Sequence, residues 1–168
     1  MSNGVLVAGI GNVFQTDDAF GVEVANRLSE RPLPRGARVE DFGIRGVHLA
    51  YELLGGYDGL VIVDALAMGE PPGTLAIMEP ELDGTSASGD DVLEVVDAHT
   101  MNPDVVLGTL RHLGGSVERI FIIGCQPANL QDGMGLSPAV AAAVDDAAEI
   151  CRQLVSELLA PREKGAYP

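Results

Sequence analysis

The chain has 168 residues, of which 10 are basic and 25 acidic, and its formal net charge at pH 7 is -15. Apolar residues make up 46% and charged residues 21%, a balance typical of a folded protein rather than a disordered one. The length favours a single domain over residues 1–160, with a frayed tail at 161–168. The negative charge argues against nucleic-acid and anionic-membrane partners, whereas a cationic partner or a metal ion would suit it.

The sequence gives little sign of export or membrane insertion. Cys125 and Cys151 are too few for a disulfide scaffold, and no apolar run reaches the roughly 18 residues of a membrane-spanning helix. The opening Met1-Ser-Asn-Gly lacks the basic residues that begin a secretory signal. We therefore expect a soluble, cytoplasmic protein.

Strand-like and helical segments alternate through the first half of the chain. An apolar run at residues 5–8 predicts a strand that is buried on both faces, and helical spacing of apolar residues follows at 18–28. The remaining segments of this half are a strand at 39–42, a helix at 47–54, a strand at 60–63 and a strand at 74–78. The short connection before the last of these makes it an antiparallel neighbour of the strand at 60–63 or a sheet edge.

The second half continues the alternation. A helix is predicted at 103–113 and a strand at 119–124. The last helix begins near Ser137-Pro138, where serine is expected as the N-cap and proline follows it, and ends near residue 159. This order predicts an α/β fold, a three-layer α/β/α sandwich with a mostly parallel central sheet of about five strands. Ligands of such folds bind at the carboxyl ends of the strands.

The first strand end carries Gly9-Ile-Gly-Asn12. A dinucleotide fingerprint would require a third glycine where this chain has Phe14, and Asp17 and Asp18 would repel a pyrophosphate. A tight strand-to-helix turn explains the glycines without a ligand. The two aspartates are adjacent, so we expect at most one of them to point into the cleft, while the other stabilises the helix dipole.

Two further residues belong near the same edge of the sheet. Asp64 directly follows the apolar strand at 60–63, although it could also serve as a turn residue. His99 lies in the loop that precedes the helix at 103–113. If the fold brings Asp18, Asp64 and His99 together, two carboxylates and an imidazole would suit a borderline divalent ion such as nickel or zinc.

Other catalytic arrangements are less well supported by the sequence. Cys125 and His99 could form a thiolate–imidazole pair, but a buried cysteine that packs as a small apolar residue is commoner. An acid dyad of Asp18 and Asp64 lacks the turn motifs of pepsin-like enzymes. The remaining histidines, His48 and His112, fall within predicted helices and are interpreted as structural or surface residues.

Several segments together resemble the hydrogenase maturation proteases, endopeptidases that trim the C-terminal tail of the large subunit of nickel-iron hydrogenases. The resembling segments occur in the same order as in that family, and together they cover residues 4–158. It is carried by the stretch from Gly9 to Val22, by Asp41-Phe-Gly-Ile-Arg-Gly46, by Val61-Ile-Val-Asp-Ala65, by Asp97-Ala-His-Thr-Met-Asn-Pro103, by Ile123-Gly-Cys-Gln-Pro127 and by Gly135-Leu-Ser-Pro-Ala139.

The resemblance implies a three-layer fold and a metal site formed by Asp18, Asp64 and His99. Many relatives have glutamate where this chain has Asp18, whose side chain is one methylene shorter. The resemblance also implies that the metal is nickel carried by the substrate, a hydrogenase large-subunit precursor, and that there is no organic cofactor. Gly43 and Gly46 are expected to let the substrate chain approach the backbone, and Gln126 is expected to line the cleft.

Two functions use the same three ligands. The first is an endopeptidase in which nickel polarises the scissile carbonyl or activates water, with Asp18 or Asp64 as general base. The second is a nickel-sensing chaperone or checkpoint module that does not cut. The full-length resemblance favours the first.

Overall fold

The computed structural model describes residues 4–80 and 103–161. Its centre is a five-stranded sheet with the strand order β2-β1-β3-β5-β4. The strands are β1 (Val5–Ile10), β2 (Ala37–Gly43), β3 (Gly59–Ala65), β4 (Leu75–Met78) and β5 (Arg119–Cys125). The first three and β5 run parallel, whereas β4 pairs antiparallel with β5.

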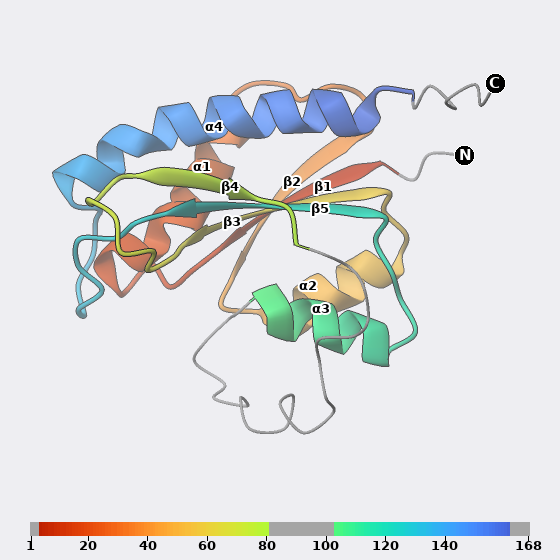
Figure 1. Cartoon of the computed structure of the whole chain (residues 1–168), viewed down its shortest axis with the longest axis horizontal. Coiled ribbons are helices and arrows are strands. Elements are labelled where there is room, and N and C mark those ends of the chain that lie inside the picture. The colour runs from red at the N-terminus through yellow and green to blue at the C-terminus, as the bar shows by residue number, and fades with distance from the viewer. Residues whose placement is uncertain (1–3, 81–102, 162–168) are drawn as a thin grey trace.

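Helices cover both faces of the sheet. They are α1 (Phe20–Ser29), α2 (Gly46–Leu54), α3 (Pro103–His112) and α4 (Pro138–Leu159). The long helix α4 lies along one face together with α1, and α2 and α3 lie along the other, as Figure 1 shows. The predicted three-layer α/β/α sandwich is confirmed. No helix in the described part of the chain combines the length and apolar character needed to cross a bilayer.

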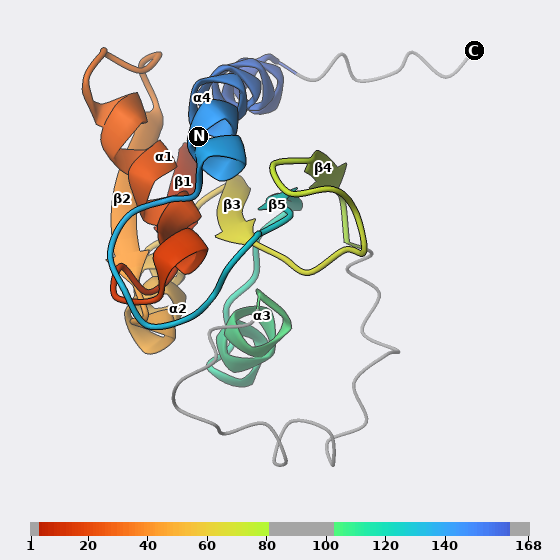
Figure 2. The same ribbon diagram turned by 90° about the vertical axis from the view of Figure 1, so that its left-hand side faces the viewer.

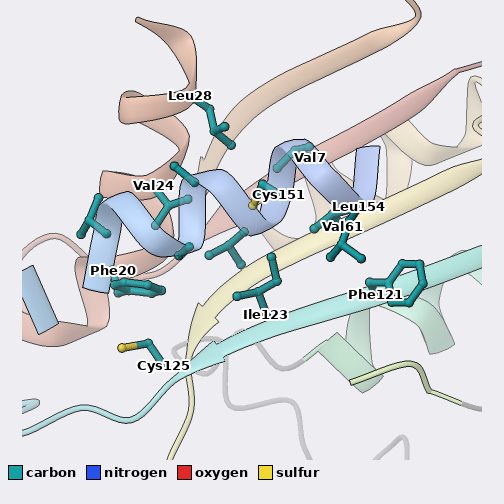
Figure 3. Close-up of a cluster of buried hydrophobic side chains, with 14 of the residues drawn as sticks. Val7, Phe20, Val24, Leu28, Val61, Phe121, Ile123, Cys125, Cys151 and Leu154 are labelled. Atoms are coloured by element: carbon teal, nitrogen blue, oxygen red, sulfur yellow. The ribbon is translucent and has the colours of Figure 1, made fainter. Parts of the chain in front are cut away.

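The two cores follow from the alternation of side chains along the strands. In β1, Val5 and Val7 pack with α1 and α4, whereas Leu6 and Ala8 pack with α2 and α3. The same alternation continues in β3 and β5. Because helices cover both faces, these strands are apolar at nearly every position, which is why they could be recognised in the sequence. Figure 3 shows the core on the α1 and α4 side, with Phe20 and Cys125 among its side chains.

Two predicted details are refined by the structure. Of the two alternatives for the strand at 74–78, the sheet edge is confirmed and the pairing with β3 is wrong, because β5 occupies the free side of β3 and β4 pairs with β5. The predicted helix at 18–28 is divided into a 3-10 turn, η1 (Thr16–Ala19), and α1. Hydrogen bonds from Thr16 and Asp17 to residues 129–133 hold this turn apart from the helix that follows.

The amino end of α1 lies very close to the carboxyl ends of β1 and β3. A Cβ atom at Gly21 would overlap the carbonyl oxygens of Val63 and Ile10. Only glycine allows this approach, which brings η1 against β3. A Cβ atom at Gly9 would likewise overlap the carbonyl oxygen of Gly21, and one at Gly11 that of Asp18. The glycines at the first strand end therefore serve close packing of helix and turn, in line with the turn interpretation. Of the predicted frayed tail, residues 162–168 lie outside the described part of the chain.

Candidate active site

The candidate site lies at the carboxyl ends of β1 and β3. Asp64 is the penultimate residue of β3, and Asp18 is on η1 just after β1. The sheet order makes β1 and β3 neighbours, so their carboxyl ends meet at one edge. This is the place that the strand-end rule for parallel sheets predicts for a ligand site.

Asp64 is buried, with 5% of its surface exposed. Burial raises the pKa of its carboxyl group well above the usual value, and the nearby charge of Asp18 raises the pKa further. A hydrogen bond with the backbone of Ala65 acts in the opposite direction but is the weakest of the three effects. The structure therefore brings Asp18 and Asp64 within electrostatic range of each other, a convergence that the sequence left conditional on the fold.

Asp18 is only partly buried. Its Oδ2 atom accepts a hydrogen bond from the backbone N–H of Asn12 at 2.8 Å. Burial raises the pKa of Asp18, and the bond from Asn12 lowers it by a smaller amount. Because Asn12 lies two positions after the end of β1, the glycine-rich turn fixes the position of this carboxylate.

Asp17 is fully buried, and its carboxylate has other partners than that of Asp18. Its carboxylate accepts hydrogen bonds from the backbone N–H groups of Ala128 (2.8 Å), Asn129 (3.0 Å) and Ser137 (2.7 Å). A fourth bond comes from the Ser137 hydroxyl at 2.9 Å. Burial alone would raise the pKa of Asp17, but these bonds outweigh it and the pKa is lowered.

The expectation for this pair of aspartates is thus partly right. One of them does face the strand end, but the other binds the loop that precedes α4 instead of merely stabilising a helix dipole. Ser137 is the N-cap of α4 and Pro138 follows it, as predicted, but the Ser137 hydroxyl donates to Asp17 and makes no cap bond to the helix. Figure 2 shows the loop between β5 and α4 passing beside the turn that precedes α1. No local pattern in the sequence signals this long-range contact.

Gly43 and Gly46 lie at the end of β2 and at the start of α2. Gly43 has φ of 55°, in the left-handed region that favours glycine, and its carbonyl accepts the N–H of Gly11 at 2.9 Å. Its own N–H donates to Asp41 Oδ1 at 2.7 Å. The segment from Gly43 to Gly46 is therefore joined to the turn that carries Asn12.

Gln126 directly follows β5, and its side chain makes hydrogen bonds within the chain. Its Oε1 atom accepts the backbone N–H groups of Met68 at 2.5 Å and Glu70 at 3.4 Å, and its Nε2 atom donates to the carbonyl of Pro127 at 3.3 Å. These contacts hold the loop after β3 beside the end of β5. The structure thus gives Gln126 a role in shaping this end of the sheet.

His99 lies outside the described residues. The other two histidines, His48 on α2 and His112 on α3, are exposed, as expected for surface residues.

Cys125 is fully buried in the core shown in Figure 3. Burial, and to a smaller extent the charge of Asp17, raise the pKa of its thiol to about 11, which disfavours the thiolate that a cysteine nucleophile needs. Among the described residues, no group of three or more His, Cys, Asp or Glu side chains could hold a metal ion.

Known proteins resemble this chain over most of its length. The model of the family described as hydrogenase maturation protease matches residues 22–153. The hydrogenase expression/formation protein HupD of Rhodobacter capsulatus is 37% identical over 153 residues, which cover 89% of this chain and 70% of HupD. The hydrogenase 2 maturation protease of Escherichia coli is 30% identical, and the match covers 86% of each chain.

Solved structures agree with this assignment. The hydrogenase maturating endopeptidase HybD from E. coli superposes with a TM-score of 0.73 at 28% identity, covering 92% of this chain and 93% of HybD. A hydrogenase 2 maturation peptidase from a Thaumarchaeota archaeon superposes with a TM-score of 0.69 at 28% identity, covering 90% and 97% of the two chains. The chain therefore belongs to the hydrogenase maturation protease family, and it is an endopeptidase of hydrogenase maturation.

Proposed function

We propose that this endopeptidase removes the C-terminal extension of a nickel-iron hydrogenase large-subunit precursor after nickel has been installed. The observation that carries the proposal is the carboxylate pair of Asp18 and Asp64 at the carboxyl edge of the sheet. The two charges repel each other in a partly desolvated position. A cation bound between them would relieve that repulsion.

We infer that Asp18, Asp64 and His99 bind the nickel that the substrate carries. By the alternation of β3, Asp64 falls in register with Leu60 and Ile62, which pack on the side of α2 and α3. The helix α3 starts at Pro103, four positions after His99 in the sequence. This arrangement supports an imidazole as the third protein ligand. Cysteine thiolates of the substrate would complete the coordination.

The two carboxylates would have different roles in hydrolysis. Nickel held there would supply Lewis-acid chemistry, polarising a carbonyl or lowering the pKa of water. Asp18 is the more accessible carboxylate, and it ionises more readily than Asp64 because the pKa of Asp64 is raised more. We therefore assign Asp18 as the general base that takes a proton from the attacking water and returns it to the leaving amine.

The substrate chain would approach along the strand ends. Gly43 and Gly46 bring backbone without side chains to this edge, which leaves room for an extended peptide. Gln126, at the end of β5, would shape the other side of this path through the loop after β3, which it holds by its bond to Met68. We expect a cytoplasmic location for this reaction, from the sequence alone.

Mass spectrometry of a large-subunit precursor, incubated with this protein with and without nickel, tests the proposal. A defined C-terminal loss only in the nickel-loaded sample is expected. The variants Asp64→Asn and His99→Ala should abolish the cut. The exposed residues His112 and Asp145 provide matched controls, His112→Ala and Asp145→Asn, which should cut normally.

An unchanged precursor mass despite a stable, nickel-dependent complex would contradict the proposal and support the checkpoint role instead. Membership in a family of endopeptidases does not favour that alternative. Cutting of nickel-free precursor at the same rate would also contradict nickel recognition, while leaving the peptidase activity itself in place.

A further inference from the structure

A groove of about 300 Å³ lies at the carboxyl ends of β1 and β2. Its apolar wall is formed by Val13, Phe14, Val22 and Ile44. The backbone N–H of Gly11 donates to the carbonyl of Gly43 at 2.9 Å, and this bond ties the loop after β1 to the loop after β2. The groove is therefore part of the folded framework and not a gap between independent loops.

Two large apolar side chains of this groove are exposed to solvent. Phe14 is 64% exposed and Ile44 is 51% exposed. Single exposed apolar residues are ordinary, but here two of them flank one concavity. Covering them with an apolar group would remove their surface from water, which is favourable.

The charged groups of the groove are bonded within the chain. The Asp41 carboxylate accepts the N–H of Gly43, and the Arg45 guanidinium donates to the carbonyls of Phe42 at 3.2 Å and Asp41 at 3.0 Å. The net charge of -15 further disfavours an acidic ligand. These features select an apolar, non-acidic segment.

We propose that this groove binds an apolar side chain of the substrate polypeptide next to the scissile bond, with Phe14 and Ile44 determining the preference. The inference rests on the proposed function. Its support is position: Asn12 lines the groove, and the backbone N–H of the same residue binds Asp18. A peptide that lies in the groove would therefore pass beside the turn that holds the proposed general base.

Steady-state cleavage of nickel-loaded precursor by Ile44→Ala tests this binding role. Removing three carbons of an apolar contact should raise KM roughly tenfold or more and leave kcat near the wild-type value. Ile77 is a matched control because it is also an isoleucine with 51% exposure, but it lies on β4 at the opposite edge of the sheet. The Ile77→Ala variant should behave as the wild type.

Substrate variants identify the occupant of the groove. The apolar residues on either side of the observed cut are replaced by serine one at a time, and each precursor is cleaved by wild type and Ile44→Ala. The effect of Ile44→Ala should shrink for one of these substrates, because the same contact is then already lost. An equal effect on all substrates, or none at all, would overturn the inference. A wild-type protein that leaves the precursor uncut would contradict the proposed function itself.

Discussion

Asp17 and Ser137 are separated by 120 positions in the chain, yet they are joined by two hydrogen bonds at 2.7 Å and 2.9 Å. Together with the bonds from Ala128 and Asn129, they fix the turn η1 to the loop that precedes α4. Because η1 also carries Asp18, the placement of the proposed general base depends on a contact with the C-terminal part of the chain.

This relationship predicts that Asp17→Ala is strongly destabilising. The substitution leaves three partly buried N–H groups and a hydroxyl without the acceptor that a buried carboxylate provides, so the free energy of unfolding should fall by about 3 kcal/mol at pH 7. Urea denaturation followed by circular dichroism measures the change. Asp145→Asn, at an exposed position on α4, should change stability by less than about 0.5 kcal/mol. Equal stability of the two variants would contradict the role assigned to Asp17.

The Asp17 carboxylate also predicts a pH dependence. Its pKa in the folded protein is lower than the ordinary value of 3.8. The resulting stabilisation is therefore complete above the unfolded pKa and is lost as the pH falls through the folded pKa. Wild type should lose stability relative to Asp17→Asn on acidification below about pH 4. Parallel stability curves for the two proteins in this range would rule out a carboxylate with a lowered pKa.

Asp64 should affect stability with the opposite sign. Its pKa in the folded protein is raised, so its contribution to stability is present below the unfolded pKa and is lost as the pH rises through the folded pKa. In metal-free protein, Asp64→Asn should therefore increase stability at pH 7, by on the order of 1 kcal/mol. The same variant should be inactive in cleavage. Urea titrations at pH 4 and pH 7 with EDTA present measure the difference, and a loss of stability at pH 7 would contradict the predicted sign.

The sequence was sufficient for the sheet because its central strands are covered on both faces. Apolar runs such as residues 5–8 and 60–63 admit few other interpretations. The meeting of Asp18 and Asp64 was only conditional in the sequence, because it requires that the strands preceding them are parallel neighbours that end at the same edge. The pairing partner of β4 in the sheet and the hydrogen bonds of Asp17 depend on tertiary contacts between distant segments. Short-range sequence patterns do not predict such contacts.

Substitutions of Asp18 distinguish whether cleavage depends on the charge of this side chain or on its length. Its Oδ2 atom is held by the backbone of Asn12 at 2.8 Å. Asp18→Glu keeps the charge and should retain cleavage within about tenfold, whereas Asp18→Asn removes the base and should reduce kcat at least a hundredfold. Cleavage rates on nickel-loaded precursor measure both effects. If Asp18→Asn cleaved as fast as Asp18→Glu, the base would have to be another group.

Gly21 gives a prediction about packing beneath the site. A Cβ atom there would overlap the carbonyl oxygens of Val63 and Ile10, so Gly21→Ala must push α1 away from the strand ends that hold the carboxylates. We expect a loss of stability of about 3 kcal/mol, together with reduced cleavage. Thermal and urea unfolding measure the stability, and cleavage of the precursor measures the effect on the site.

Gly108 is the matched control for this substitution, because it lies within α3 and a Cβ atom would meet nothing within 4 Å. There the change to alanine should stabilise the protein by about 0.5–1 kcal/mol, since alanine is the better helix former. Cleavage should be unaffected. A Gly21→Ala variant as stable as Gly108→Ala would show that α1 can move without cost, and the close approach of helix and strands would then not be what positions Asp18 beside Asp64.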